Sequence, residues 1–391
     1  MTHLRPLTAT LAALALGGGL SACTENAPAG DAAGGGGRAL SVSSTSDACE
    51  VSAEEAPAGT LTFDVTNAGD EVTEFYLLAE DGLRIVAEVE NVGPNLSRQL
   101  VVDAPAGEYV TACKPGMVGE GIRSAFTVTP SDEEVVVSAD EQQLVDDAEG
   151  SYQTYVQDQS DQLVVGTEAF VAAYTSGDDD RAREIYPEAR THWERIETVA
   201  ESFGDLDPQM DAREADLEPG QAWTGWHLLE KDLWPKRAQG YTPLTDAERA
   251  RYAGKLMEDT ETLDARIGEL ELTVDQIANG SRGLLEEVAT GKVTGEEEYW
   301  SRTDLYDFQA NVDGARVGFE GVRPLLEEKD PELAAQLDLR FTDLQDLLDE
   351  QRRGDGFVGY DEVPAREIKQ LADAVNALSE PLSRLTAAVL A

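Results

Sequence analysis

Basic residues are scarce in this chain. Its 391 residues include 30 lysines and arginines against 77 aspartates and glutamates, and the formal net charge is -47 at pH 7. A surface with this balance repels phosphate backbones, which excludes nucleic acid as an expected partner. It is compatible with a cationic partner, with high-salt surroundings or with solubility alone. Most of these carboxylates are expected to lie on solvated faces.

Long apolar runs are lacking too. No stretch reaches the roughly 18 apolar residues that a membrane-spanning helix needs. A short run, Leu7–Leu16, is followed by Leu20-Ser21-Ala22-Cys23, and this layout is typical of an export signal. We therefore expect residues 1–23 to be a signal peptide and residues 24–39, which are rich in Ala and Gly, to be a flexible linker.

The tetrad Leu20-Ser21-Ala22-Cys23 resembles the lipobox of bacterial lipoproteins. In that motif the cysteine carries the lipid. The resemblance therefore implies that Cys23 is lipidated and holds the protein at the outer face of the cytoplasmic membrane. The rest of the chain would then be extracytoplasmic.

Cysteine is the next scarce residue, with three in the chain. Besides Cys23 there are Cys49 and Cys113, both within residues 40–130, where apolar and polar residues alternate with a period of two. This alternation, interrupted by Gly, Pro and Asp, predicts a small antiparallel β-sandwich. In an exported protein two such cysteines form a disulfide by default, although two reduced thiolates with nearby carboxylates would suit a metal.

The segment Gly107–Met117 ends a predicted strand at Cys113 and reaches Met117 after a short loop. This layout is similar to the ligand loop of cupredoxins. An ordinary blue-copper site also needs two histidines, and residues 40–130 contain none. The domain is therefore not expected to be a type 1 copper protein, and a structural sandwich and a thiolate–carboxylate metal site both stay open.

The period of the apolar residues changes to 3.6 after residue 132 and stays there to the end. Candidate helices are separated by Gly and Pro and cover residues 139–175, 179–203, 221–234, 245–270, 273–291, 295–318, 325–352 and 364–390. We expect residues 138–391 to form an all-α bundle. The expected fold class is α+β with two domains.

Histidine is as scarce as cysteine. His3 leaves with the signal peptide, so His192 and His227 are the candidates for imidazole chemistry. His227 and Glu230 are three residues apart on the helix predicted over residues 221–234, so both side chains can face one ion. An isolated pair of this kind is also typical of a hydrogen-bonded histidine beside a core.

His192 lies on the apolar face of the second predicted helix. Glu194, Glu197 and Glu201 form a stripe on the opposite side, which the simplest interpretation assigns to solvent. An acidic loop, Gly204–Glu214, lies between the two histidine segments and could add a carboxylate to a site. One imidazole with several carboxylates suits iron or zinc better than copper(I).

Two motifs resemble one family. Gly225-x-His227-x-x-Glu230 matches the GxHxxE motif of the imelysin (M75) domain, and His192-Trp193-Glu194-Arg195-Ile196-Glu197 resembles a second block of that domain. A cupredoxin-like domain before an imelysin domain is the arrangement of the EfeO family of iron-uptake lipoproteins. The resemblance implies a cupredoxin-like β-sandwich at residues 40–130 and an imelysin-like helical bundle at residues 138–391.

The resemblance also implies metal ligands. Those of the helical domain would be Glu194, Asp207, His227 and Glu230, whereas His192 and Asp211 stay open. Those of the cupredoxin-like domain would be Cys49, Glu74 and Cys113. The metal would be iron, as Fe2+ or Fe3+, with copper or zinc as alternatives.

By the same resemblance, the protein would capture iron outside the cytoplasmic membrane and deliver it to a membrane permease, with a haem peroxidase as a further partner. A metal-dependent enzyme, either a ferroxidase or an M75 peptidase, is the alternative. The usual metallopeptidase motif is H-E-x-x-H, and His227-Leu228-Leu229-Glu230 lacks its second histidine, which disfavours the peptidase. A surface adhesin without metal is the remaining hypothesis.

Replacing Cys23 with serine tests the expected anchor. The wild type should incorporate labelled palmitate and sediment with membranes, whereas Cys23→Ser should lose the label and become soluble, because serine cannot form the thioether. Cys49→Ser leaves the lipobox intact and is the control, so it should stay labelled. A labelled Cys23→Ser variant would contradict lipidation at this residue.

Overall fold

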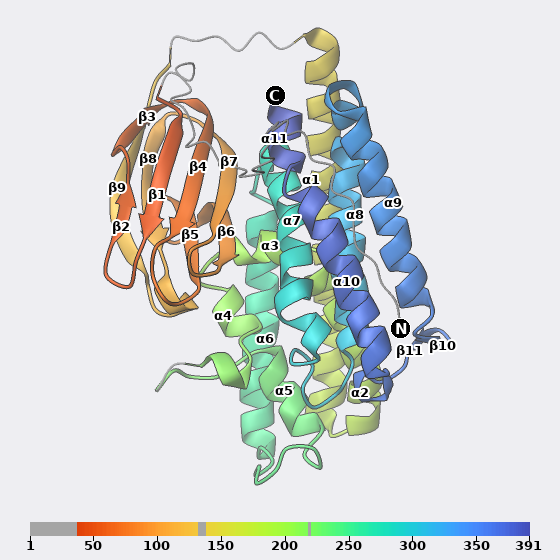
Figure 1. The fold of residues 1–391 in the computed structure, drawn as a ribbon. Helices are drawn as coiled ribbons and strands as arrows, with labels where there is room; N and C mark the ends of the chain where they lie inside the picture. The colour runs from red at the N-terminus through yellow and green to blue at the C-terminus, as the bar shows by residue number, and fades with distance from the viewer. Residues whose placement is uncertain (1–36, 132–137, 218–219) are drawn as a thin grey trace, which may run out of the picture. The chain divides into compact units, whose positions relative to one another are not determined.

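The computed structural model describes residues 37–131, 138–217 and 220–391. The expected signal peptide, its lipidation site Cys23 and most of the linker lie outside the described residues. The described chain begins with a β-domain, coloured orange in Figure 1, and continues as a helical domain, coloured yellow to blue. This confirms the two-domain α+β class predicted from the two periodicities.

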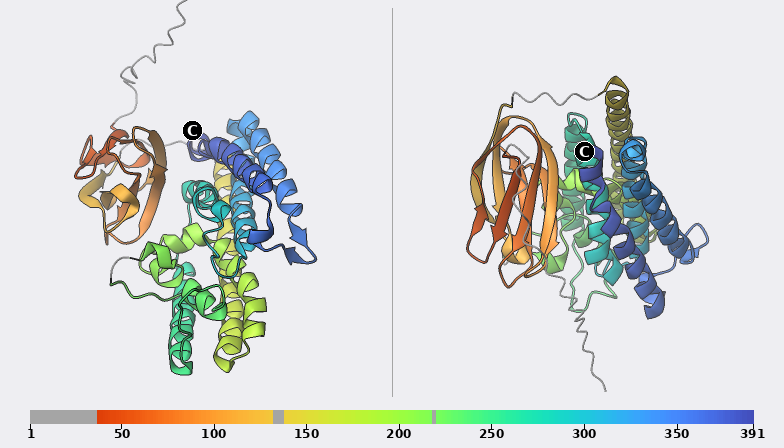
Figure 2. Two further views of the ribbon diagram at one scale, coloured as in Figure 1. Left: turned by 60° about the horizontal axis from the view of Figure 1, so that its bottom comes forward. Right: turned by 45° about the horizontal axis from the view of Figure 1, so that its top comes forward.

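The β-domain consists of two sheets that face each other (Figure 2). Their strand orders are β2-β1-β4-β7 and β3-β9-β8-β5-β6. The strands are β1 (Ala39–Ser44), β2 (Cys49–Val51), β3 (Glu55–Pro57), β4 (Gly59–Asn67), β5 (Thr73–Ala79), β6 (Ile85–Val92), β7 (Ser97–Ala104), β8 (Gly107–Cys113) and β9 (Ile122–Thr129). Alternate residues such as Leu61, Phe63 and Val65 on β4 fill the space between the sheets, which is why a period of two predicts this layer.

The sandwich is not purely antiparallel. β1 pairs in parallel with β4, and β3 pairs in parallel with β9, whereas the remaining pairs of the two sheets are antiparallel. The expectation of an antiparallel sandwich is therefore wrong for these two pairs. The parallel pairs arise because the chain crosses to the other sheet at β3 and returns at β4. A hydrophobic alternation does not encode such a crossing.

A disulfide joins the two sheets. It connects Cys49 on β2 with the fully buried Cys113 at the end of β8, two residues separated by 64 positions in the sequence. Closing so long a loop stabilises the fold mainly by restricting the unfolded chain. Of the two states left open by the sequence, the structure has the disulfide, in which neither sulfur is a thiolate.

The helical domain starts with its longest helix, and two short antiparallel strands lie between its helices α9 and α10 (Figure 1). Its helices are α1 (Ala139–Ser176), α2 (Asp179–Glu194), α3 (Glu197–Glu201), α4 (Asp207–Met210), α5 (Trp226–Leu233), α6 (Asp246–Ile267), α7 (Val274–Thr290), α8 (Asp304–Lys329), α9 (Pro331–Asp349), α10 (Ala365–Leu382) and α11 (Leu385–Leu390). The strands are β10 (Arg352–Arg353) and β11 (Gly356–Phe357). Helix α1 packs against α2 and α6, and α7 packs against α8. Over the described residues, no helix has the length and apolar character needed to span a bilayer.

Helix α8 begins later than expected. The pattern predicted a helix over residues 295–318 and a break at Pro324, whereas α8 covers Asp304–Lys329 with Pro324 inside it. Val322, Leu325 and Leu326 are buried beside the proline, so tertiary packing outweighs its local preference. Residues 296–303 form a loop in front of the helix instead.

The single helix predicted over residues 179–203 is two helices, because α2 ends at Glu194 and α3 begins at Glu197. Asn311 of α8 donates a hydrogen bond of 2.7 Å from its side-chain amide to the backbone oxygen of Glu194. Gly314 lies one turn further along α8, and a Cβ there would come within 2.3 Å of the backbone oxygen of Arg195. The close approach of α8 to this break therefore requires glycine.

A pair of glycines on α8 tests that contact. Gly314→Ala should lower the free energy of unfolding by about 1–3 kcal/mol, because the methyl group has no room beside Arg195. Gly321→Ala is the matched control: no atom lies within 4 Å of a Cβ there, and helix propensity should stabilise this variant by up to about 1 kcal/mol. Urea denaturation followed by circular dichroism measures both, and equal effects would contradict the close approach.

Candidate metal centre

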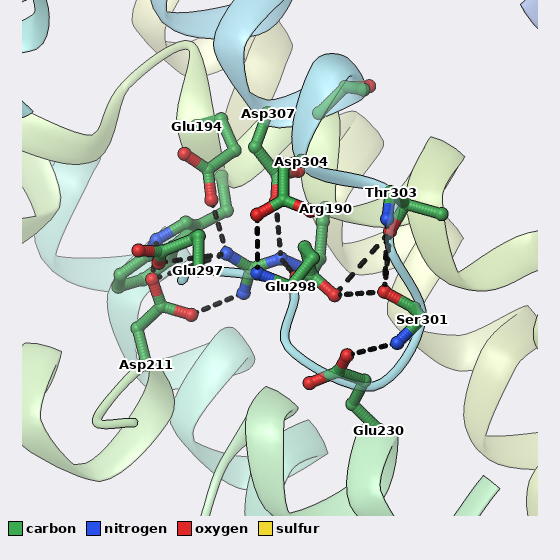
Figure 3. Close-up of polar contacts among 12 residues, drawn as sticks. Arg190, Glu194, Asp211, Glu230, Glu297, Glu298, Ser301, Thr303, Asp304 and Asp307 are labelled. Atoms are coloured by element: carbon green, nitrogen blue, oxygen red, sulfur yellow. Dashed lines mark hydrogen bonds and ion pairs between the residues drawn. The ribbon is translucent and has the colours of Figure 1, made fainter. Parts of the chain in front are cut away.

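Acidic side chains from several helices converge inside the helical domain (Figure 3). All have 9% or less of their surface exposed, and they are Glu194, Glu197, Asp211, Glu230, Glu297, Glu298, Asp304 and Asp307. The buried side chains of Arg190, Lys292 and His227 lie among them. We call these eight carboxylates and three nitrogen-bearing residues the acid centre.

His227 has carboxylates beside both of its ring nitrogens. Its Nε2 lies 3.4 Å from Glu297 and 3.5 Å from Asp211, and its Nδ1 lies 3.5 Å from Glu230 and 3.8 Å from Glu298. The ring is fully buried, yet neither nitrogen makes a hydrogen bond to any residue that the structure describes. Buried polar atoms are normally paired. Two ring nitrogens that make no hydrogen bond and face four carboxylates are therefore suited to binding a cation.

The backbone at Gly225 sets the position of His227. Gly225 precedes α5 with φ of 88°, a conformation that side chains other than glycine rarely adopt. A Cβ there would lie 2.1 Å from the backbone oxygen of Met210, the last residue of α4. This contact brings the end of α4, and with it Asp211, against the start of α5. The glycine of GxHxxE therefore places Asp211 beside His227.

Glu230 is held from the other side. Its Oε1 accepts hydrogen bonds from the backbone nitrogens of Trp300, at 2.8 Å, and Ser301 (Figure 3). Its Oε2 has no hydrogen-bond partner in the described chain and lies 3.5 Å from Nδ1 of His227. The loop before α8 thus orients one oxygen and leaves the other for a ligand.

Arg190 occupies the middle of the carboxylates (Figure 3). Its guanidinium group donates to Glu194 and Asp211, lies 2.8 Å from Glu298 through Nε, and lies 3.6 Å from Asp307. Asp211 and Glu298 therefore face both this cation and the ring of His227. A metal ion at His227 would share these two carboxylates with Arg190.

Lys292 is the second buried cation. Its Nζ lies 2.9 Å from both oxygens of Glu197 and 3.1 Å from Glu194. Asn311 donates to Glu197 at 2.8 Å and completes this group. The side chain of Lys292 is 1% exposed, so its charge depends on these carboxylates.

The acid centre carries eight carboxylates against two permanent cations. Buried negative charge in excess must be offset by protons or by bound cations. Burial raises the pKa of Asp304 and of Glu298 to about 7, so both carboxyl groups hold protons well above their usual range. Burial and Arg190 lower the pKa of His227, but Asp211, Glu230 and Glu297 outweigh them and raise it well above its usual value. A bound cation would replace such protons.

The available donor atoms suit a borderline or hard cation. Apart from the His227 nitrogens and Glu230 Oε2, the unpaired buried atoms here include Oδ2 of Asp304 and both oxygens of Asp307. Carboxylate oxygen with imidazole nitrogen is a set that fits iron, zinc or manganese, and it lacks the sulfur that copper(I) prefers. Ligand chemistry in the helical domain therefore agrees with the metal expected from the motif.

The structure brings Glu194, His227 and Glu230 into the acid centre, but not Asp207. Asp207 is in none of the groups of ligand atoms that surround His227 in the described chain, and it lines a cleft together with Glu201. Helix α4 is a single turn, and its C-cap residue Asp211 faces His227 instead. The sequence alone could not separate two aspartates on one turn.

His192 lies outside the acid centre. Its Nδ1 is 2.9 Å from the side-chain oxygen of Gln159, and burial together with Arg195 lowers its pKa to about 4. Glu194 and Glu197, expected on a solvated stripe, are 0% and 5% exposed. The expectation fails because this bundle has a polar interior, so its acidic face is a buried face.

Six members of the acid centre were missed from the sequence: Arg190, Lys292, Glu297, Glu298, Asp304 and Asp307. Glu297 and Glu298 belong to the run Glu296-Glu297-Glu298, which is typical of a solvated surface. Asp304 and Asp307 lie in the first turn of α8, where acids are common at any helix start. No local signal distinguishes these residues from ordinary surface acids.

The expected ligands of the sandwich do not form a comparable group. Cys49 and Cys113 are joined by the disulfide. Glu74 is 3% exposed and accepts a hydrogen bond of 2.6 Å from the hydroxyl of Tyr76, and burial raises its pKa. No candidate metal group within the described ranges includes a residue of the sandwich.

Comparison with known proteins adds a family to this geometry. The family model described as imelysin, of the M75 peptidases, matches residues 148–385. A protein named "Efem/EfeO family lipoprotein" from Staphylococcus haemolyticus is 44% identical over 237 residues, which cover 60% of this chain and 80% of the relative. Proteins named "Iron uptake system component EfeO" are 34% identical over 352 residues in Escherichia coli O1:K1 and 35% over 340 residues in Yersinia pestis. These alignments cover 88% and 86% of this chain, and 90% and 87% of the relatives.

Asp304 provides a test of the buried charge. With a folded pKa of about 7 against a usual value of 3.8, the native state keeps a proton that the unfolded state has lost, so this group makes the wild type less stable as the pH rises from about 4 to 7. Asp304→Asn cannot ionise and keeps an acceptor for the backbone nitrogen of Glu298. Its stability relative to the wild type should therefore increase by about 2–4 kcal/mol across this window.

The measurement is urea denaturation of metal-free protein at several pH values, with a chelator present. Asp373→Asn, on the exposed surface of α10, is the control and should track the wild type. A constant difference between Asp304→Asn and the wild type would contradict a protonated buried acid.

Proposed function

Because this chain belongs to the EfeO family of imelysin-domain proteins, we propose that it is the iron-binding component of an iron-uptake system. It is held by lipid outside the cytoplasmic membrane, captures iron in its helical domain and delivers it to a membrane permease. The observation that carries this proposal is the acid centre, where the ring nitrogens of fully buried His227 and one carboxylate oxygen of fully buried Glu230 make no hydrogen bond to any described residue. The names of the relatives supply iron as the metal.

The proposed ligands are His227, Glu230, Asp211 and Glu297, with Glu298 as a further candidate. Their atoms form two groups that share the imidazole, and the atoms of each group lie within 4.8 Å of one another. Carboxylate oxygens and one imidazole accept both Fe2+ and Fe3+, and the same donors accept zinc. Iron is the cargo here, so the site must release it as well as bind it.

Arg190 and Lys292 support exchange rather than permanent binding. Arg190 contacts Asp211 and Glu298, which lie beside the ring of His227. Lys292 contacts Glu194, which does not lie beside the ring but also binds Arg190. When iron leaves, these cations and protons can neutralise the carboxylates again, so the fold does not require the metal. A resident cofactor site would have less reason to keep a competing cation, Arg190, beside its own ligands Asp211 and Glu297.

Binding without turnover is what separates this proposal from the enzyme alternative. The M75 name belongs to a peptidase family, whereas the relatives are named as iron-uptake components. With Fe2+ under oxygen, and after subtraction of the rate of a protein-free control, a carrier should form ferric iron only up to its bound equivalents. Continued ferric production beyond them would favour a ferroxidase.

The two histidines of the described chain test the site. Anaerobic equilibrium dialysis should find that the wild type binds Fe2+, and that His227→Ala weakens binding by at least about 100-fold, since even groups behind the ligands change metal affinity by 10–100-fold. His192→Ala is the matched control and should bind like the wild type, because His192 bonds to Gln159 outside the acid centre.

Circular dichroism of each variant excludes unfolding as the cause of lost binding. Equal affinities of the wild type and His227→Ala would overturn the proposal. Loss of binding in His192→Ala at an intact fold would move the site elsewhere.

A further inference from the structure

Among the residues that the structure describes, the ligand atoms of the helical domain form four overlapping groups. In each group the atoms lie within 4.8 Å of one another. The groups are, from the outside inward, Glu197/Glu201/Glu287, Glu194/Glu197/Asp211, Asp211/His227/Glu297 and His227/Glu230/Glu298. Each group shares one residue with the next, namely Glu197, Asp211 and His227. We call this series the carboxylate chain.

The two ends of the carboxylate chain differ in exposure. Glu201 and Glu287, in the first group, are partly exposed and line the same cavity of about 80 Å³. Glu197 and Asp211 are 5% and 9% exposed, and the last group, which contains Glu230, is fully buried. The first group is therefore the end of the carboxylate chain that an ion from solvent would reach.

The buried end is the one whose ligand atoms lack hydrogen bonds. Both ring nitrogens of His227 and Oε2 of Glu230 are without hydrogen bonds in the described chain although both side chains are 0% exposed. These atoms point to a cation as the ligand, and a cation can reach them only through protein. An ion that left water before meeting new ligands would lose its solvation in a low-dielectric interior, which is prohibitive.

Shared ligands solve this problem. At Glu197 and Asp211 an ion can bind the next group before it releases the previous one, and Asp211 then delivers the ion to Nε2 of His227. Carboxylates suit such a transfer because each offers two oxygens, one for each neighbouring position. An ion moving along the carboxylate chain therefore keeps oxygen or nitrogen ligands at every step.

Lys292 stands in this path. Its Nζ is 3.1 Å from Glu194 and 2.9 Å from Glu197, so it occupies the second group as a resident cation. A metal ion and an ammonium group repel each other at this distance in a buried site. Lys292 therefore has to move aside whenever an ion passes, and Arg190, which donates to Glu194 and Asp211 of the same group, has to release them as well. Lys292 is the first residue of the short 3-10 helix Lys292–Thr294, which lies between Gly291 and Gly295 and is not part of a long helix.

We propose that the carboxylate chain is the route by which iron travels between solvent and His227, and that Lys292 is the gate on this route. This inference rests on the proposed function and adds to it how iron enters and leaves the site. Glu201 and Glu287 are entry residues, which touch the ion in passage and not in the final site. Residues of a route change the rates of binding and release together, whereas ligands change the affinity.

Stopped-flow kinetics of Fe2+ without oxygen tests the route. The fluorescence of Trp193, whose indole donates to Asp211 at 3.0 Å, reports binding, and a chase with a ferrous chelator reports release. In the double variant Glu201→Gln/Glu287→Gln, both rates should fall by about tenfold or more while the dissociation constant stays within roughly twofold. Glu258→Gln/Glu261→Gln is the control, since it removes the same charge from exposed positions on α6.

The control also separates a route from long-range attraction. Loss of surface charge alone would slow binding equally in both double variants and leave release unchanged. Equal binding rates in the two double variants, or unchanged release from Glu201→Gln/Glu287→Gln, would overturn the route. If the wild type bound no iron, the route and the proposed function would fall together.

The gate has its own variant. Lys292→Met keeps the length of the side chain and removes its charge, so both binding and release should become faster than in the wild type. Lys292→Arg keeps the charge in a larger group and should not accelerate either rate. Thermal melting and circular dichroism establish that both variants are folded. A folded Lys292→Met with unchanged or slower exchange would overturn the gate.

Discussion

The helical domain depends on one constraint, which is that eight buried carboxylates must be neutralised. Arg190 and Lys292 supply two permanent charges, and raised pKa values keep several acids protonated. Such an interior is costly to build, because each buried charge loses its hydration. Ordinary bundles avoid this cost with an apolar core. Retaining so many acids agrees with the proposed role of receiving a cation.

The irregular parts of the helical domain follow from the same constraint. A straight helix presents only one face to a buried point, so few carboxylates could converge from long helices alone. The break between α2 and α3, the single turn of α4 and the loop before α8 each bring acids to the centre from a new direction. The long helices α1, α7, α8 and α9 supply much of the apolar packing around them. Regular packing and irregular chemistry are thus divided between different segments.

The sequence predicted the fold better than the site, and the reason is physical. Periodicity reports which face of an element is apolar, so it identified the sandwich, the bundle and most helix ranges. It could not report the parallel pairs of the sandwich, because strand order depends on distant parts of the chain. His227 and Glu230 were found because they are neighbours on one helix. Glu297 and Glu298 were not, because a polar interior reverses the rule that acids lie outside, and nothing local marks the reversal.

The close contact at Gly225 changes how the GxHxxE motif can be used. Because Gly225 has no side chain, the backbone carbonyl of Met210 can lie against the start of α5. Asp211, which follows Met210, therefore lies next to the imidazole of His227. The glycine thus reports on a carboxylate that the motif itself never mentions. A search for related sites that required the glycine would select chains in which an acid from another segment is already docked. A search that accepted any residue at the glycine position would also select helices that carry only the histidine and the glutamate.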